Sequence, residues 1–285
     1  MQNLRDGQSN LHSKITQIQA KGLKEKRGVY NKIMNINLEK SREEKRLLLL
    51  TLYDYLEESF RAFELACKPG CAFCCTSKLY TTSVEAEYLL EGLKERDLSL
   101  VNSFNLYPRP KRTHNQLALL YYTGQEPPFE EEGPITPCPF LTEESLCSVY
   151  ERRPLICRIQ LSQSPCEVSG EAQIQPELYL MGIIALQIAE NIDVSGLYGN
   201  LFDLLKFWNL YQREKSVEVP HYLLSPQTFE ELPLLPEERA LRKWVGELYR
   251  RKVRGEQSFR ELLDELQVSF KEERPLSFLD ELWRE

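Results

Sequence analysis

Hydrophobic residues recur at intervals of three or four along most of the chain, and this is the periodicity of an amphipathic helix. Large apolar residues from Leu48 to Phe63 form one such stripe. Ser41 and Glu44 precede it with the spacing of a capping box. This pattern predicts a helix over residues 42–66 that stops before the Pro69–Gly70 turn.

The same periodicity predicts helices over most of the remaining chain. Thr82 and Glu85 form a second capping box, which begins a helix that reaches Leu93. Further helices are predicted at residues 115–122, 176–192, 197–211, 236–251 and 258–271. The prolines and glycine within 127–139 predict an irregular loop, because proline removes a backbone donor and fixes φ. Alternation with a period of two is almost absent, so we expect a mainly α fold.

The length of 285 residues is enough for a full hydrophobic core without disulfide bridges. Residues 1–34 are polar and include a run of Lys and Arg between 21 and 27, which predicts a solvated tail. We expect a helical domain over residues 35–213 that carries a cysteine cluster. Residues 214–285 contain no cysteine and predict a C-terminal helical extension.

Composition and charge narrow the functional classes. Lys and Arg number 36 against 43 Asp and Glu, so the net charge of −7 disfavours general nucleic-acid binding. The first ten residues lack the apolar core of a secretory signal, and no apolar stretch is long enough to cross a membrane. We therefore expect a cytoplasmic protein, whose environment keeps thiols reduced. The C-terminal helices are the expected surface for any protein partner.

The eight cysteines are confined to one part of the chain, between positions 67 and 166. They are Cys67, Cys71, Cys74, Cys75, Cys138, Cys147, Cys157 and Cys166. Clustered thiolates in a reducing compartment are typical of zinc and iron–sulfur sites. Disulfides and inert buried thiols are the alternatives, and they explain the clustering less well. The adjacent side chains of Cys74 and Cys75 point apart on an extended backbone, so the pair is not expected to chelate one ion. One of the two can be a ligand while the other faces a second site or stays free, or, in a helical turn, both can reach one polynuclear cluster.

Several motifs in one order carry a family resemblance. The Cys67–Cys75 group, the Cys-Pro-Phe-Leu run from Cys138, and the segment from Cys147 through Arg153–Pro154 to Cys157 resemble the YkgJ-type cysteine-cluster family. Members are described as zinc- or iron-chelating proteins with a CxxCxxCC motif. This chain departs from the family in having three residues between Cys67 and Cys71.

The resemblance implies a metal centre with all eight cysteines as candidate ligands. We favour an iron–sulfur cluster over zinc, although the residues themselves leave both open. Lys68, Lys78, Arg152, Arg153 and Arg158 flank the cysteines and are expected to offset thiolate charge. Tyr150 is expected to cover the site, and Pro154 to turn the chain so that Cys157 returns to it.

Other catalytic signals are weak. The chain has no phosphate-binding loop, no GxGxxG and no HExxH. His12, His114 and His221 are isolated, and His114 is the best spare ligand among them. Two further functions stay open: a protein-modifying enzyme, because flagellin lysine methylases carry a similar cysteine cluster, and a helical interaction module with structural zinc.

Overall fold

The computed structural model describes residues 41–129, 133–214 and 217–272. The predicted tail over 1–34, its basic run and His12 lie outside these ranges. From Glu44 onward the described chain forms one compact unit. Its first described helix covers residues 41–60.

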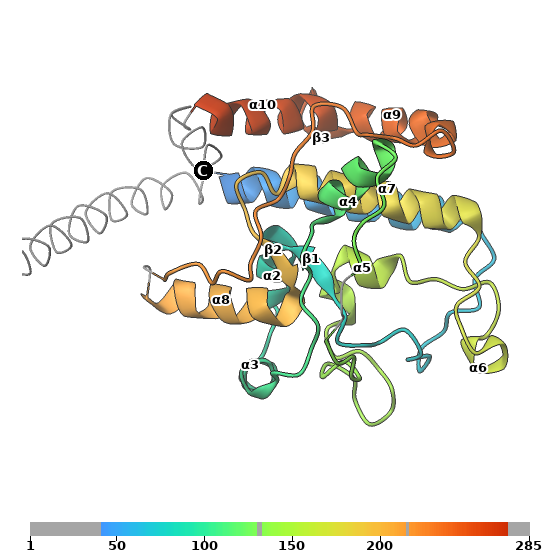
Figure 1. Cartoon of the computed structure of the whole chain (residues 1–285), viewed down its shortest axis with the longest axis vertical. Helices are drawn as coiled ribbons and strands as arrows, with labels where there is room; N and C mark the ends of the chain where they lie inside the picture. Colours follow the sequence, from blue (N-terminus) through green and yellow to red (C-terminus); the bar gives the residue numbers. More distant parts are fainter. Residues whose placement is uncertain (1–40, 130–132, 215–216, 273–285) are drawn as a thin grey trace, which may run out of the picture. The chain divides into compact units, whose positions relative to one another are not determined.

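The remaining elements are mainly short to medium helices, as Figure 1 shows. The α-helices are α2 (Ser83–Leu90), α3 (Glu95–Ser103), α4 (His114–Tyr122), α5 (Leu155–Arg158), α6 (Cys166–Ser169), α7 (Pro176–Ile192), α8 (Leu201–Glu214), α9 (Arg242–Arg250) and α10 (Phe259–Glu272). Two 3-10 turns, η1 (Tyr150–Arg152) and η2 (Glu238–Leu241), accompany them. The strands are β1 (Tyr80–Thr82), β2 (Tyr198–Asn200), β3 (Lys252–Arg254) and β4 (Gln257–Ser258). The prediction of a mainly α fold is confirmed.

A first hydrophobic core joins the 41–60 helix to α7, α9 and α10. Leu52 and Leu56 of the first helix and Ile184 and Ile188 of α7 are completely buried in it. Figure 1 shows α9 and α10 on one side of α7, with α8 on the other. The apolar stripe that predicted the first helix therefore faces this core.

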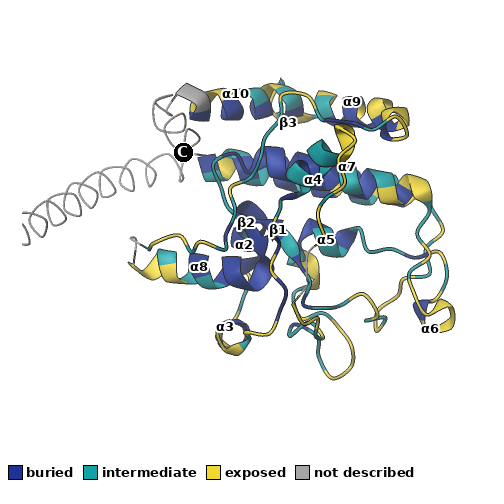
Figure 2. Ribbon diagram, in the orientation of Figure 1, coloured by how far each residue is buried: buried dark blue, intermediate teal, exposed yellow. Residues whose placement is uncertain are grey.

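A second hydrophobic core lies between α2 and α8 and extends to the loops that carry cysteines. Phe202 of α8 is completely buried, and its ring contacts the ring of Phe140 at 5.7 Å between centroids. Strands β1 and β2 pair antiparallel beside this core, with Tyr80 opposite Asn200. Figure 2 shows α2 and the first turns of α8 in the colour of buried residues, whereas the loops below them are half-buried or exposed.

Several predicted helix boundaries are wrong. Helix α2 ends at Leu90 instead of Leu93, α8 ends at Glu214 instead of residue 211, and α9 begins at Arg242 instead of residue 236, because the 3-10 turn η2 precedes it. The first helix ends at residue 60 instead of 66, because the N–H groups of residues 61–63 donate to carbonyls three residues earlier and tighten the last turn. The backbone then leaves the helix axis, and the N–H of Ala66 donates to the Ser162 carbonyl at 2.8 Å. Helix α8 begins at Leu201 instead of 197, because residues 198–200 pair with β1.

The prediction for α7 agrees with the structure at both ends, and that for α4 agrees to within one residue. Helix α3 was not predicted, because only two of its nine residues, Asp97 and Val101, are buried. The strands are three residues long or shorter, too short to produce an alternating pattern. Within the described ranges, no helix has the length and apolar character needed to cross a membrane.

Candidate metal centre

The first cysteine group lies in the loop between the 41–60 helix and β1. Gly70 adopts a left-handed φ of 85°, which closes the turn that Pro69–Gly70 predicts. The N–H of Cys71 donates to the Lys68 carbonyl at 3.0 Å, and the N–H of Cys75 donates to the Ala72 carbonyl at 3.0 Å. Two consecutive turns therefore fold residues 68–75 back on themselves.

Backbone pairing brings the second group to the first. Thr76 and Pro137 form an antiparallel bridge, and the N–H of Cys138 donates to the Cys75 carbonyl at 3.0 Å. Ser77 strengthens the pairing from both sides: its N–H donates to the Thr136 carbonyl at 2.7 Å, and its hydroxyl accepts the Thr136 N–H at 2.9 Å. Cys75 and Cys138 are thus neighbours in space although far apart in sequence.

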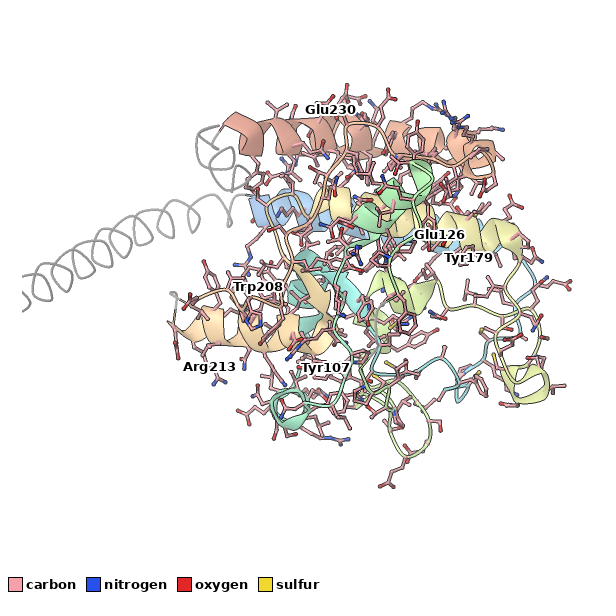
Figure 3. The ribbon with its side chains drawn as sticks, viewed as in Figure 1. Tyr107, Glu126, Tyr179, Trp208, Arg213 and Glu230 are labelled. Carbon is pink, nitrogen blue, oxygen red and sulfur yellow. The ribbon has the colours of Figure 1, made fainter. Side chains whose placement is uncertain are left out.

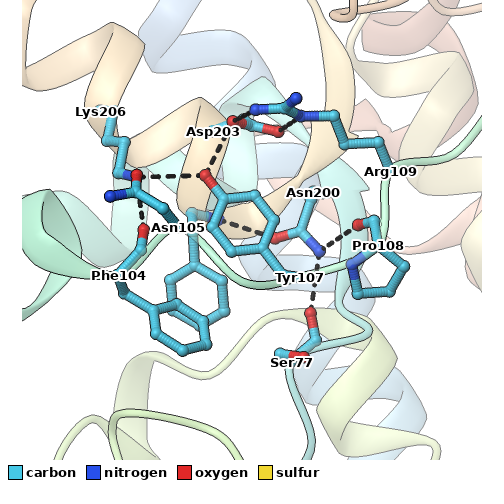
Figure 4. Close-up of polar contacts among 10 residues, drawn as sticks. Ser77, Phe104, Asn105, Tyr107, Pro108, Arg109, Asn200, Asp203 and Lys206 are labelled. Carbon is cyan, nitrogen blue, oxygen red and sulfur yellow. Dashed lines mark hydrogen bonds and ion pairs between the residues drawn. The ribbon is translucent and has the colours of Figure 1, made fainter. Parts of the chain in front are cut away.

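Ser77 is itself tied to the second core by a completely buried asparagine. Asn200 donates through Nδ2 to the carbonyls of Ser77 at 2.8 Å and Pro108 at 2.9 Å (Figure 4). Tyr107, just before Pro108, donates its hydroxyl to Asp203 of α8 at 2.8 Å. Figure 3 labels Tyr107 near the start of α8. The base of the cysteine loop is therefore fixed to a rigid helix.

A tight hairpin holds Cys138 and Cys147. Leu141 and Cys147 form an antiparallel bridge, and the N–H of Leu141 donates to the Cys138 carbonyl at 3.1 Å. The hairpin is anchored through Phe140, which is 2% exposed in the second core. Cys138 and Cys147 are half-buried and pack against that core, as does Cys157.

Cys157 lies on α5, one turn after Pro154. The N–H of Cys157 donates to the Pro154 carbonyl at 2.9 Å, so this proline does precede the turn that carries Cys157. The first residue of α5, Leu155, donates its N–H to the buried carboxylate of Glu85 at 2.6 Å. Glu85 was identified in the sequence only as a helix cap. Its second role could not be read from sequence, because the two residues meet only in the tertiary fold.

Cys166 begins α6 and is buried, at 6% exposure. The hydrogen bond from Ala66 to Ser162 brings the start of the first cysteine loop to the segment before α6. Burial raises the pKa of Cys67, a backbone hydrogen bond with Ser162 lowers it, and the negative charges of Cys71, Cys74 and Cys166 raise it. Cys67 and Cys166, the first and last cysteines in the sequence, are therefore close enough for the charge of Cys166 to affect the pKa of Cys67.

Cys157 interacts with thiols of both cysteine groups. Burial raises the pKa of Cys157 well above its ordinary value, and the charges of Cys138, Cys147 and Cys74 raise it further. Burial also raises the pKa of Cys138, to about 12. A metal ion that binds these thiols as thiolates must therefore displace their protons.

Cys74 and Cys75 form a hydrogen-bonded pair of thiols. The bond to Cys75 raises the pKa of Cys74, because Cys74 is the donor, and it lowers the pKa of Cys75, the acceptor. The charges of Cys157, Cys138 and Cys147 raise the pKa of Cys75. The charge of Cys74 in turn raises the pKa of Cys67.

The cations near the cysteines have separate roles. Burial raises the pKa of Cys147 and Cys157, and the charge of Arg153 opposes part of that rise, as expected of a residue that offsets thiolates. Arg158 is 7% exposed and forms an ion pair with Glu57, and its guanidinium lies 4.1 Å from the centroid of the Tyr53 ring.

Tyr150 and His114 differ in their surroundings. Tyr150 is 56% exposed, and the centroid of its ring lies 3.8 Å from the guanidinium carbon of Arg153. His114 is half-buried and packs against the ring of Tyr198, with a backbone hydrogen bond to Tyr80. Burial lowers its pKa to about 4, so it is neutral.

The donor chemistry fits a thiophilic metal. All eight cysteines are free thiols, and thiolates are the preferred ligands of zinc and iron–sulfur clusters. Among the described residues, no group of three or more Cys, His, Asp or Glu side chains is already arranged to hold a metal ion. Ligation therefore requires the thiol side chains to turn toward a common point, on loops whose backbone already brings the cysteines together.

Residues 66–176 match the family model CxxCxxCC, described as a "putative zinc- or iron-chelating domain". The matched segment contains all eight cysteines and covers less than half of the chain. This similarity supports metal binding through cysteines and is compatible with either metal. No curated protein and no solved structure matches the chain.

Proposed function

We propose that this chain is a metal-binding protein that holds an iron–sulfur cluster or zinc through its clustered cysteines, with an iron–sulfur cluster and a redox role favoured. The candidate ligands are Cys67, Cys71, Cys74, Cys75, Cys138, Cys147, Cys157 and Cys166. One observation carries the proposal: all eight are free thiols in a segment that matches a metal-chelating domain. The YkgJ-type motifs favour the same function.

The chain's own residues contribute positioning and charge. The backbone bonds at Cys75, Cys138 and Ser77 place two cysteine groups side by side. Burial favours the thiol forms of Cys147 and Cys157, and the charge of Arg153 opposes part of this effect, which helps the thiolate forms that bind metal. A bound cluster supplies one-electron chemistry, whereas zinc supplies a redox-inert crosslink. The proposal requires a reducing compartment such as the cytoplasm.

Anaerobic purification followed by elemental analysis and a visible spectrum tests the proposal. An iron–sulfur protein contains iron and acid-labile sulfide and has visible absorbance that bleaches on reduction. A colourless protein with stoichiometric zinc would retain the metal-binding function and refute the redox role. A protein that takes up neither metal when reduced and reconstituted would refute the function itself.

Substitution identifies the ligands. Cys138→Ser is expected to lower metal content, because serine is a poor ligand for a thiophilic metal. Ser148→Ala is the matched control, because it lies on the same hairpin and only its backbone N–H is bonded, to Phe140. Equal metal content in both variants would remove Cys138 from the ligand set.

A further inference from the structure

The backbone contacts separate the cysteines into two neighbourhoods. Cys75, Cys138 and Cys147 are joined by the bond from Cys138 to Cys75 and by the hairpin bridge at Cys147. Cys157 enters this neighbourhood on α5, and it packs with Cys138 and Cys147 against the second core. We name these four the inner set.

The other four cysteines belong to a different neighbourhood. The bond from Ala66 to Ser162 joins the start of the first loop to the segment that leads into α6, where Cys166 lies. The turn from Lys68 to Cys71 then carries the loop onward to Cys74. We name Cys67, Cys71, Cys74 and Cys166 the outer set.

The two sets meet within the first loop. The N–H of Cys75 donates to the Ala72 carbonyl at 3.0 Å and closes the outer segment, and the Cys75 carbonyl accepts the N–H of Cys138 at 3.0 Å, where the inner segment begins. Cys74 and Cys75, which are adjacent in sequence and hydrogen-bonded, are where the two sets meet.

The two sets differ in their access to solvent. In the outer set Cys67 and Cys74 are exposed, Cys71 is half-buried and Cys166 is buried, whereas all four inner cysteines are half-buried. A chelator can therefore reach two of the outer ligands directly from solvent. The inner loops are also held by the paired bonds of Ser77 and by the buried Phe140. A chelator removes metal by direct contact with an exposed ligand or after a local opening of the loop. Both events are easier in an exposed loop with few hydrogen bonds to the rest of the protein.

We propose that the eight thiols form two separate metal sites of four thiols each, which divide between Cys74 and Cys75. The inner site, Cys75, Cys138, Cys147 and Cys157, retains its metal. The outer site, Cys67, Cys71, Cys74 and Cys166, exchanges its metal with solution. This inference rests on the proposed function and adds to it a difference in exchange between two sites.

Zinc binding to the reduced, metal-free full chain tests the inference, with native mass spectrometry to count bound ions. The wild-type chain is expected to bind two ions, and a chelator is expected to remove one of them at least tenfold faster than the other. Cys157→Ser is expected to leave one ion that is lost rapidly. Cys71→Ser is expected to leave one ion that is lost slowly.

Two control variants match these substitutions. Ser148→Ala lies in the inner hairpin, and Val168→Ala changes an 84% exposed residue on α6, so both should bind two ions. A wild-type chain that binds one ion, lost in both cysteine variants, would overturn the division into two sites while leaving metal binding intact. Two ions that leave at the same rate would overturn the difference in exchange. A wild-type chain that binds no zinc or iron would refute the proposed function instead.

A second measurement needs no variant and so does not depend on a variant's folding. The wild-type chain is treated briefly with chelator until one ion is lost, and free thiols are then alkylated and mapped by peptide mass spectrometry. Cys67, Cys71 and Cys74 are expected to be labelled, with Cys75, Cys138 and Cys147 protected. Equal labelling of both sets would overturn the proposal.

Discussion

Glu85 is expected to control how firmly the cysteine-bearing helix α5 is attached to the rest of the protein. Its side chain is 1% exposed. Oε1 accepts the Leu155 N–H at 2.6 Å and the Tyr53 hydroxyl at 2.9 Å. Oε2 accepts the hydroxyls of Thr81 and Thr82 and the Thr82 N–H at 3.3 Å. Five donors, two of them backbone N–H groups, therefore converge on one carboxylate.

The loss of stability on substitution of Glu85 depends on which of these five donors can find another hydrogen-bond acceptor. In Glu85→Gln, the amide oxygen can keep Leu155 and Tyr53, and the threonine hydroxyls can rotate to accept from the new amide. The N–H of Thr82 cannot reorient, and a buried unsatisfied N–H costs about 1–3 kcal/mol. We expect a loss of about 2 kcal/mol in the free energy of unfolding. Glu85→Ala removes the acceptor for both backbone N–H groups and is expected to cost about 4–5 kcal/mol.

The assay is urea unfolding of the reduced, metal-free protein, so that loss of metal does not contribute. Trp208 lies in the second core and Trp244 in the first, so fluorescence reports both. Glu143→Ala is the control: this side chain is exposed on the cysteine hairpin, and its removal should change stability by less than about 0.5 kcal/mol. If Glu85→Ala costs no more than Glu143→Ala, the convergence of donors on Glu85 does not stabilise the fold.

Three further substitutions test other buried groups by the same unfolding assay. Gly196→Ala places a Cβ against the carboxylate of Asp193, which pairs with a buried lysine, so we expect a loss of about 3 kcal/mol; a neutral result would contradict this packing. Burial raises the pKa of Glu190 to about 7, so its neutral form is favoured in the fold and stability is lost as pH rises from about 4.5 to about 7. Relative to Glu190→Gln, the wild type should therefore become less stable over this range, and a pH-independent difference would refute the shift. Asn200→Asp turns a carboxylate oxygen toward the carbonyl of Ser77 and is expected to lower the free energy of unfolding by about 3 kcal/mol. Because Asn200 holds the base of the cysteine loop, we also expect Cys75 to be alkylated faster in this variant. Slower alkylation would contradict the link from Asn200 to the loop.

The sequence determined the features that depend on local chemistry. Apolar periodicity was enough to predict the mainly α fold, both ends of α7, and α4 to within one residue. A helix that faces a core needs that spacing whatever it packs against. Clustering of the cysteines was enough to locate the segment that matches the zinc- or iron-chelating family model. Gly70 supplied the turn inside the first group, because its left-handed φ favours a residue without a Cβ.

Only the tertiary structure decided which cysteines are neighbours. Cys75 lies with Cys138 because of a backbone bond between segments far apart in sequence, and Cys67 lies toward Cys166 because Ala66 bonds to Ser162. The sequence carries no local signal for these pairings, since each depends on loops that are held by Ser77, Glu85 and Asn200. Buried donors and acceptors need hydrogen-bond partners because folding removes them from water. In these loops the partners come from distant segments, and these segments meet only in the folded chain.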